Sequence, residues 1–449
     1  AFIIDPLREI EPYLDRLRRD KVTLKYIFET HFHADFVSGH LDLSKKTGAP
    51  IVYGPGANPD FEAHIATDGE IFRVGKVHFK VLHTPGHTME SVCYLLADEN
   101  GKDVALFSGD TLFIGDVGRP DLAQKATDMT KEELAATLFD SLRNKVMPLN
   151  DDIIVYPAHG AGSACGKNMS KETSDTLGHQ KKVNYALRSD MTKDEFVKEV
   201  TAGLMPPPAY FPLNVMLNKH GYESIDDIME RGNIALSPGA FEEAANDTGA
   251  LILDTRDAKQ FADGFIPNSI NIGIDGNFAP WVGVLITDIR QEILIVAENG
   301  REEEVITRLA RVGYDHTIGF LEGGIDAWKA AGKETDTIKS IRANELASVL
   351  KKNRNEILLD VRKPDEYLSE HVMNAESAPL DFINESMLKV SKNSNNYLHC
   401  ASGYRSMIFA SILKSRGYDN VINVSGGFNE IKEEAEIPVT NFVCPTTLV

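Results

Sequence analysis

The stretch T-H-F-H-A-D-F at residues 30–36 decides the fold, because it places His31, His33 and Asp35 directly after the apolar run LKYIF (24–28). Three other apolar runs end just before a potential metal ligand: VHFKVL before His87, DVALF before Asp110 and DIIVY before His159. Such runs predict strands. Side chains that meet at the ends of several strands are held by a rigid sheet, and this is how proteins position metal ligands. The sequence therefore predicts a metal site on a sheet.

Three further motifs follow in a fixed order, T-P-G-H (84–87), S-G-D (108–110) and Y-P-A-H (156–159). Together with the first stretch they resemble the metallo-β-lactamase superfamily, whose signature reads H-x-H-x-D-H. Phe36 stands where the last histidine of the signature would lie, and phenylalanine cannot coordinate the second metal that this histidine normally helps to hold. The resemblance implies an αββα sandwich.

The ligand set that remains is His31, His87 and Asp110. Two imidazoles and one carboxylate with open positions are typical of non-haem Fe(II) oxygenases rather than of closed zinc sites. We therefore expect one Fe(II) per chain. Two alternatives stay open for the other three polar residues: they bind a second metal weakly, or they surround the first site, where they orient ligands and take protons. These residues are His33, Asp35 and His159.

The composition excludes several classes of function. A net charge of −20 argues against nucleic acid and anionic membranes as partners, and no apolar run approaches the roughly 20 residues of a membrane span. The four cysteines are scattered and lack the spacing of a disulfide scaffold, so we expect reduced thiols and a cytoplasmic location. The chain starts at Ala1 inside a predicted strand, so we expect residues to precede it.

The chain of 449 residues is long enough for about three domains. Residues 1–190 alternate strands with helical segments, such as 6–21 and 131–147. Proline is concentrated in M-P-P-P-A-Y-F-P-L (205–213), where it interrupts regular structure. We therefore expect a metallo-β-lactamase-like domain with the iron site at 1–190, an extension and linker at 191–235, and two small parallel-sheet α/β domains at 236–337 and 338–449.

The last two domains are an internal repeat. L-I-L-D-T-R (251–256) corresponds to I-L-L-D-V-R (357–362), and Gly323-Gly324 corresponds to Gly426-Gly427. Both units resemble the rhodanese family through the pattern D-x-R-x-x-x-E-Y near the start, which ends in Q-F in the first unit, and through the paired glycines near the end.

The two copies differ in one loop. The second copy has H-C-A-S-G-Y-R-S (399–406), which matches the family's C-x-x-x-x-R catalytic loop with Cys400 as the nucleophile. Backbone N–H groups around Ser402, Gly403 and Tyr404 would form an anion cradle, and with Arg405 would favour a thiolate that accepts sulfur as a persulfide.

The first copy reads V-A-E-N-G-R-E-E (296–303) in the same place. Ala297 stands at the position of the cysteine, and a methyl group cannot carry sulfur. The glutamates that follow it would oppose anion binding. The first copy is therefore predicted to be catalytically inactive.

The whole chain resembles fusions of a persulfide dioxygenase with an inactive and an active rhodanese domain. The resemblance implies oxidation of a low-molecular-weight persulfide by O₂ to sulfite, and transfer of sulfur from Cys400 to sulfite to give thiosulfate, as in sulfide detoxification. Homo-oligomers are plausible in this family. In G-R-P-D (118–121), Arg119 and Asp121 match family positions, and the arginine would hold the anionic substrate.

Cys165, six residues after His159 in Y-P-A-H-G-A-G-S-A-C-G (156–166), has two interpretations. It shuttles sulfur to the metal, in which case its Sγ should be accessible to solvent, or it is an unreactive loop residue. Two rival functions also remain. One is a glyoxalase II-type zinc thioester hydrolase, whose two-metal site requires a histidine at residue 36. The other is a docking role for the rhodanese pair.

Overall fold

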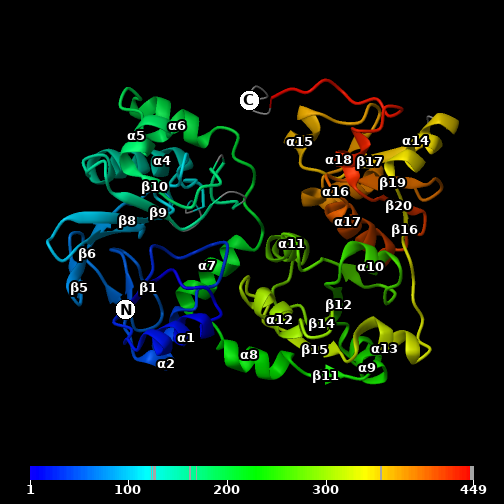
Figure 1. Cartoon of the computed structure of the whole chain (residues 1–449), viewed down its shortest axis with the longest axis horizontal. Helices are drawn as coiled ribbons and strands as arrows, with labels where there is room; N and C mark the ends of the chain where they lie inside the picture. Colours follow the sequence, from blue (N-terminus) through cyan, green and yellow to red (C-terminus); the bar gives the residue numbers. More distant parts are fainter. Residues whose placement is uncertain (123, 125–127, 161–162, 168, 354–355, 445–449) are drawn as a thin grey trace. The chain divides into compact units, whose positions relative to one another are not determined.

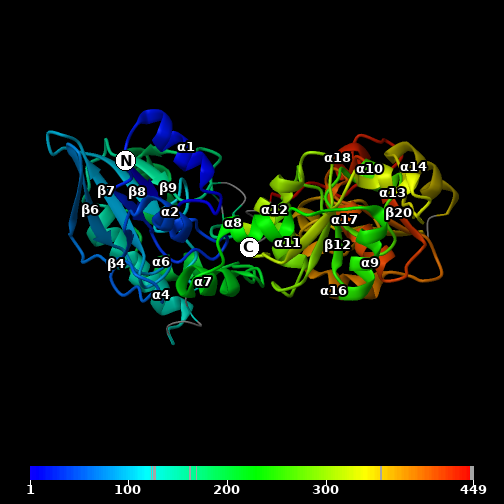
Figure 2. The same ribbon diagram turned by 90° about the horizontal axis from the view of Figure 1, so that it is seen from below.

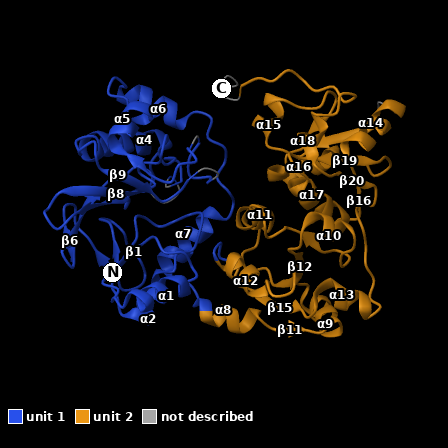
Figure 3. Cartoon of the chain, in the orientation of Figure 1, with its two compact units in different colours: residues 1–225, 311–313 blue, residues 226–310, 314–449 orange. Residues whose placement is uncertain are grey.

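The computed structural model describes residues 1–122, 124, 128–160, 163–167, 169–353 and 356–444. The chain divides into two compact units, which Figure 3 colours separately: residues 1–225 with 311–313, and residues 226–310 with 314–449. Each unit is described by itself. No helix in the described part of the chain combines the length and the apolar character that a membrane span requires.

Unit 1 contains two sheets. The first is parallel with the order β1-β2-β3-β4, and its strands are β1 (Phe2–Ile4), β2 (Tyr26–Phe28), β3 (Ile51–Tyr53) and β4 (His64–Ile65). The second sheet has the order β10-β9-β8-β7-β6-β5. Its strands are β5 (Ile71–Val74), β6 (Val77–His83), β7 (Val92–Ala97), β8 (Asp103–Gly109), β9 (Ile154–Pro157) and β10 (Asp175–Thr176). Neighbouring strands in this sheet are antiparallel except for β8 and β9, which run parallel.

Helices cover both outer faces of this pair of sheets, and α1 and α4 lie on opposite sides in both Figure 1 and Figure 2. The helices of unit 1 are α1 (Glu11–Asp20), α2 (His40–Thr47), α4 (Lys131–Ser141), η1 (Leu142–Val146), α5 (Leu177–Val183), η2 (Tyr185–Leu187), α6 (Lys193–Thr201) and α7 (Phe211–His220). The two helices predicted from the sequence are present, although α1 begins at Glu11 and the second continues as the π-helix η1.

Alternation along β7 explains the layers. Val92 and Tyr94 point into the apolar layer between the two sheets, whereas Cys93 and Leu95 point into the layer beneath the helices. The inner layer is rich in aromatic rings: the ring of Phe28 in the first sheet lies 4.6 Å from that of Tyr94. A period of two places one set of side chains on each face of a strand, so the predicted αββα sandwich is confirmed.

Unit 2 contains two five-stranded parallel sheets with the same strand order. One has the order β11-β15-β14-β12-β13, with β11 (Ala235–Leu236), β12 (Leu251–Asp254), β13 (Ile270–Asn271), β14 (Ile293–Val296) and β15 (Thr317–Leu321). The other has the order β16-β20-β19-β17-β18, with β16 (Lys339–Ile341), β17 (Ile357–Asp360), β18 (Glu376–Ser377), β19 (Asn396–His399) and β20 (Val421–Val424). The predicted repeat and the α/β fold class are confirmed.

The helices follow the same repeat. The first copy has α9 (Pro238–Thr248), α10 (Ala258–Ala262), α11 (Phe278–Leu285), α12 (Glu302–Ala310) and α13 (Gly324–Ala330). The second has α14 (Ala343–Lys352), α15 (Pro364–Ser369), η3 (Leu380–Phe382), α16 (Ile383–Ser386), η4 (Met387–Lys389), α17 (Tyr404–Ser415) and α18 (Gly427–Ile431). The region expected to be an extension and linker contains α6, α7 and α8 (Ile225–Gly232).

The paired glycines have the same backbone role in both copies. Gly324 and Gly427 have φ values of 60° and 57°, a region that strains residues with a β-carbon. The space around them differs, because a β-carbon on Gly427 would lie 2.4 Å from the carbonyl oxygen of Cys400, whereas on Gly324 the nearest atom would be the oxygen of Ala297 at 3.3 Å.

This difference gives a matched pair of variants. Gly324→Ala should lower the free energy of unfolding by about 1–2 kcal/mol, the cost of a left-handed backbone. Gly427→Ala adds a collision with backbone and should lower it further. Urea unfolding of the full chain, followed by circular dichroism, measures both losses. Equal losses would contradict the packing argument.

Candidate functional sites: a metal centre and a thiol loop

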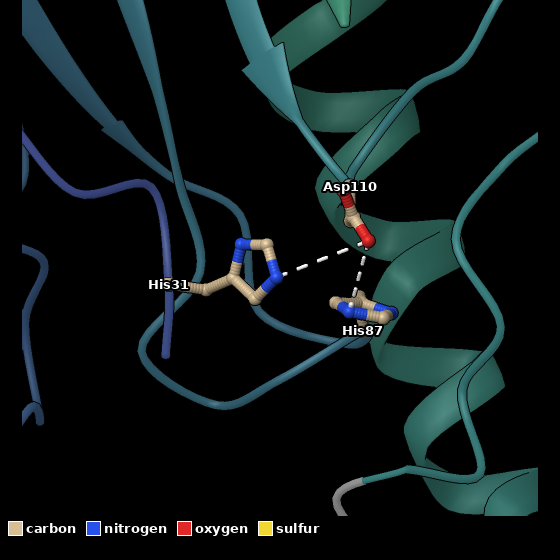
Figure 4. Close-up of side chains that lie close together, drawn as sticks. All are labelled: His31, His87 and Asp110. Atoms are coloured by element: carbon tan, nitrogen blue, oxygen red, sulfur yellow. Dashed lines mark ion pairs between the residues drawn. The ribbon is translucent and has the colours of Figure 1, made fainter. Parts of the chain in front are cut away.

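Three buried side chains meet at the ends of three strands of unit 1. His31 follows β2, His87 follows β6 and Asp110 follows β8. The Nε2 atoms of His31 and His87 lie 3.8 Å and 3.4 Å from Oδ2 of Asp110, and Figure 4 shows both rings turned toward this carboxylate. The three predicted ligands are thus brought together in a geometry that one metal ion could bridge.

The surroundings of Asp110 fit a metal. Among the described residues, neither carboxylate oxygen has a hydrogen-bond partner, and the residue is 2% exposed. A buried carboxylate that accepts no hydrogen bond is costly, and a cation between the three ligands would lower that cost. Burial, together with the neighbouring histidines, holds the pKa of His31 well below its usual range. The neutral imidazole is the form that binds a metal.

Hydrogen bonds orient both imidazoles. Nδ1 of His87 lies 2.8 Å from the carbonyl oxygen of Arg119, which leaves Nε2 facing Asp110. Nδ1 of His31 lies 3.0 Å from Oγ1 of Thr30. Gly118 permits this packing, because a β-carbon there would lie 2.1 Å from the carbonyl oxygen of Asp110. Such partners fix the tautomer and direction of a ligand.

A second group lies beside the first. His159 Nε2 is 3.3 Å from Oδ1 of Asp110, and its Nδ1 is 3.5 Å from Oδ2 of Asp35. His33, Asp35 and His159 together could hold a metal. Burial opposes protonation of His159, but the carboxylates of Asp110 and Asp35 outweigh it and raise the pKa. Phe36 packs against this group, with its ring centre 4.3 Å from that of His33 and 6.5 Å from that of His159.

The other face of His33 meets two acidic residues, Asp5 and Glu29, that no sequence motif identifies. Its Nε2 lies 3.1 Å from Oδ1 of Asp5 and 3.6 Å from Oε2 of Glu29. Burial and the nearby Asp5 raise the pKa of Glu29, although a hydrogen bond from Ser38 opposes this shift. His33 therefore lies between two polar groups.

Asn218 on α7 is a further residue that sequence reasoning missed. Its Nδ2 donates to the carbonyl oxygens of His33 and Phe36, both at 2.8 Å, and its Oδ1 accepts from the N–H of Ser38 at 2.8 Å. One amide thus fixes the backbone of the ligand-bearing loop. No motif could have found it, because a lone asparagine near the proline-rich stretch carries no sequence signal.

Arg119 and Asp121 form a paired contact, with Nε to Oδ1 and Nη2 to Oδ2 each at 2.7 Å. The guanidinium also donates to the carbonyl oxygens of Ala164 and Met205, and the backbone N–H of Arg119 donates to Cys165. Arg119 therefore ties the 163–167 segment to His87. In this arrangement its donors bind protein groups, and its predicted role in holding an anionic substrate stays a prediction.

Cys165 lies close to the metal group but is buried. Its Sγ belongs to a set with Asp110 and His159 whose ligand atoms lie within 4.8 Å of one another. The residue is 1% exposed, so the accessible Sγ that the shuttle interpretation requires is not observed. Burial, followed by the charges of Asp35 and Asp110, raises the pKa of the thiol well above its usual value. Ala161 and Gly162 of the same stretch lie outside the described residues.

In unit 2, Cys400 lies between β19 and α17. Its Sγ accepts a hydrogen bond from the N–H of Gly403 at 3.2 Å. Arg405, next along the loop, makes a paired contact with Glu366 at 2.6 Å and 2.8 Å, which raises the pKa of Arg405 in spite of its burial. Ser402 in the same loop is exposed, whereas Cys400 itself is 1% exposed. Gly403 thus contacts the sulfur directly, and the charge of Arg405 lies close enough to interact with Cys400.

The first copy lacks this chemistry. Ala297 occupies the position after β14 that Cys400 occupies after β19, and it is buried. Arg301, which aligns with Tyr404, pairs with Asp275 at 2.8 Å and with Glu304 at 2.9 Å. The loop therefore has no thiol, and its one guanidinium is already paired with carboxylates.

Two families match the sequence. The metallo-beta-lactamase superfamily matches residues 1–159, and the rhodanese-like domain matches residues 237–331 and 342–434. The chain is also similar to a metallo-beta-lactamase from Staphylococcus aureus subsp. aureus COL, with 31% identity and a TM-score of 0.62 over 72% of this chain and 91% of that one.

Curated relatives match the N-terminal part. The hydroxyacylglutathione hydrolase GloC of Haemophilus influenzae is 31% identical over 37% of this chain and 83% of its own length. A probable hydroxyacylglutathione hydrolase of Schizosaccharomyces pombe is 32% identical over 40% of this chain and 66% of its own, so the chain spans just under two thirds of that relative. The chain belongs to the metallo-beta-lactamase superfamily and carries two rhodanese-like domains after that part of the sequence.

The packing of Phe36 predicts the metal content. The wild type should hold about one metal per chain, as expected for a two-histidine, one-carboxylate site. Phe36→His should raise the content toward the two of a paired-metal site, because it adds a donor beside His159, whereas Phe36→Leu should leave it unchanged. Elemental analysis after metal loading measures this. Two metals in the wild type would refute the prediction.

The burial of Cys165 predicts low reactivity. A buried thiol with a raised pKa supplies little thiolate, so iodoacetamide should label the exposed Cys444 much faster than Cys165 in native protein. Mass spectrometry of the peptides measures the two rates, with urea-unfolded protein as the control in which both react. If Cys165 and Cys444 were labelled at comparable rates in native protein, the interpretation of Cys165 as an accessible thiol would be supported instead.

Proposed function

We propose that this protein is an Fe(II)-dependent persulfide dioxygenase coupled to a rhodanese sulfurtransferase, and that it removes sulfide as sulfite and thiosulfate. The observation that carries the proposal is the packing of Phe36 against His33 and His159 beside the group His31, His87 and Asp110. An aromatic ring in place of a ligand favours one metal with open positions over a metal pair.

The first reaction is the oxidation of a persulfide: RSSH + O₂ + H₂O gives RSH and sulfite with two protons. Iron held by His31, His87 and Asp110 would supply the binding and activation of O₂. The protein fixes the ligands through Thr30 and the carbonyl oxygen of Arg119. Burial of all three ligands excludes bulk water from the site. Dry, preoriented groups are what a reactive centre requires.

The second reaction occurs at Cys400. Its persulfide, formed from a donor persulfide, passes the outer sulfur to sulfite: the S–S bond of the protein breaks, an S–S bond to sulfite forms, and the thiolate and thiosulfate remain. The N–H of Gly403 donates a hydrogen bond to the sulfur and so helps to hold it in place. Arg405 is held near it by Glu366.

The names of the relatives favour a second candidate, hydrolysis of a hydroxyacylglutathione thioester. The scaffold is shared, and the group His33, Asp35 and His159 could hold a second metal. The absence of a histidine at residue 36 argues against this function, because a two-metal hydrolase uses both ions to activate and orient water.

Two assays on iron-loaded protein separate the candidates. We expect O₂ uptake with glutathione persulfide and little hydrolysis of S-lactoylglutathione. Cys400→Ser should leave O₂ uptake within about twofold of the wild type, since it removes no group of the metal site, and should abolish thiosulfate so that sulfite accumulates. Cys444→Ser is the matched control. Hydrolysis without O₂ uptake would overturn the dioxygenase, and thiosulfate from Cys400→Ser would overturn the role of that residue.

A further inference from the structure

The helix that follows the thiol loop is enclosed on all sides. Residues 406–413 of α17 are all buried. A helix that is apolar or buried all round lies between two layers rather than on one. On one side α17 contacts β19 and β20 of its own copy, and on the other it contacts β13 and α10 of the inactive copy. Figure 1 shows α17 next to α10.

Specific contacts run along the side that faces the inactive copy. Oη of Tyr404 donates to the carbonyl oxygen of Gly273 at 2.8 Å, and Oγ of Ser411 accepts from the N–H of Asn271 at 2.9 Å. Tyr404 and Ser411 are seven residues apart, about two helical turns, so they share one face. The inactive copy therefore holds α17 from its first residue.

The ring of Tyr404 lies against glycines of the inactive copy. A β-carbon on Gly276 would lie 2.3 Å from Cζ of this ring, and one on Gly273 would lie 3.3 Å from Cε2. Contacts under 3.0 Å force an atom to move, and here the obstacle is a rigid aromatic ring. Residue 276 must therefore stay without a side chain if Tyr404 is to keep its place.

In the sequence, Tyr404 lies between Gly403 and Arg405, the two residues of the loop with donors near Cys400. Gly403 on one side donates its N–H to Sγ of Cys400, and Arg405 on the other side is paired with Glu366. Adjacent residues share peptide planes, so a shift of Tyr404 reorients both neighbours. Displacements of about 1 Å in positioning groups can lower catalytic efficiency by about a hundredfold.

We propose that the inactive copy positions the sulfur-transfer loop: its 271–277 segment fixes Tyr404, and through Tyr404 it fixes the Gly403 N–H and Arg405 beside Cys400. The side chain of Tyr404 acts as a positioning group, whereas its backbone N–H belongs to the predicted anion cradle. This inference rests on the proposed sulfur transfer at Cys400. It gives the copy that has no thiol a role in the reaction of the other copy.

Gly276→Ala in the full chain tests the inference, with thiosulfate as sulfur donor and cyanide as acceptor. We expect the KM for thiosulfate to rise about tenfold, because the donors that bind this anion are displaced. A partial loss of folded protein would instead lower kcat and leave KM unchanged. Gly239→Ala is the matched control, since it lies in the same copy and a β-carbon there would meet no described atom within 4 Å.

Single substitutions of Tyr404 add no atoms and decide the question even if Gly276→Ala does not fold. Tyr404→Phe loses the bond to Gly273 but keeps the ring, so KM should rise less than in Tyr404→Ala. Adding Gly276→Ala to Tyr404→Ala should change KM no further, because no ring remains to collide with it. Ser411→Ala, on the same face but away from the loop, should keep the KM of the wild type.

Three results would overturn the inference: an unchanged KM in folded Gly276→Ala, an unchanged KM in Tyr404→Ala, or a KM in the double variant that multiplies the two single effects. Failure of the proposed sulfur transfer looks different. In that case the wild type and Cys400→Ser would have the same activity, whatever residue 276 is.

Discussion

A carboxylate without donors governs the arrangement of unit 1. Asp110 is buried, and neither of its oxygens accepts a hydrogen bond from a described residue. Such a group is tolerated where something else neutralises it. The imidazoles of His31, His87 and His159 surround it, and each comes from a different strand end. The sandwich, its loops and the bracing by α7 all serve to keep these groups around one buried charge.

The ligand set could be read from the sequence because its signal is local. Each ligand follows a short apolar run, and the strand period then fixes where the side chain lies. Asn218, the pairing of Arg119 with Asp121, and the burial of Cys165 could not be read in this way. They depend on how distant segments pack, and a single sequence contains no periodicity that reports such contacts. Accessibility in particular is a property of the neighbours of Cys165 and not of its own motif.

The internal repeat could also be predicted from the sequence. Comparison of the two copies distinguishes the residues that support the fold from those that carry the chemistry. Arg256 binds Asp254 as Arg362 binds Asp360, in both cases with Nη2 to Oδ2 at 2.6 Å, so this pair supports the fold whether or not the copy is active. The loops, in contrast, differ at every charged position. The sequence revealed that the first copy lacks a thiol, but the contact of Gly276 with Tyr404 required the packing of one copy on the other.

The connection between His87 and Cys165 through Arg119 has a thermodynamic consequence. The carbonyl oxygen of Arg119 holds the imidazole, while its N–H and guanidinium hold the carbonyl oxygens of Cys165 and Ala164. Any ligand that draws this segment outward must strain the residue that orients His87. Linkage is reciprocal, so a cation that tightens His87 also resists exposure of the thiol. Metal binding at His87 and exposure of the Cys165 thiol should therefore oppose one another.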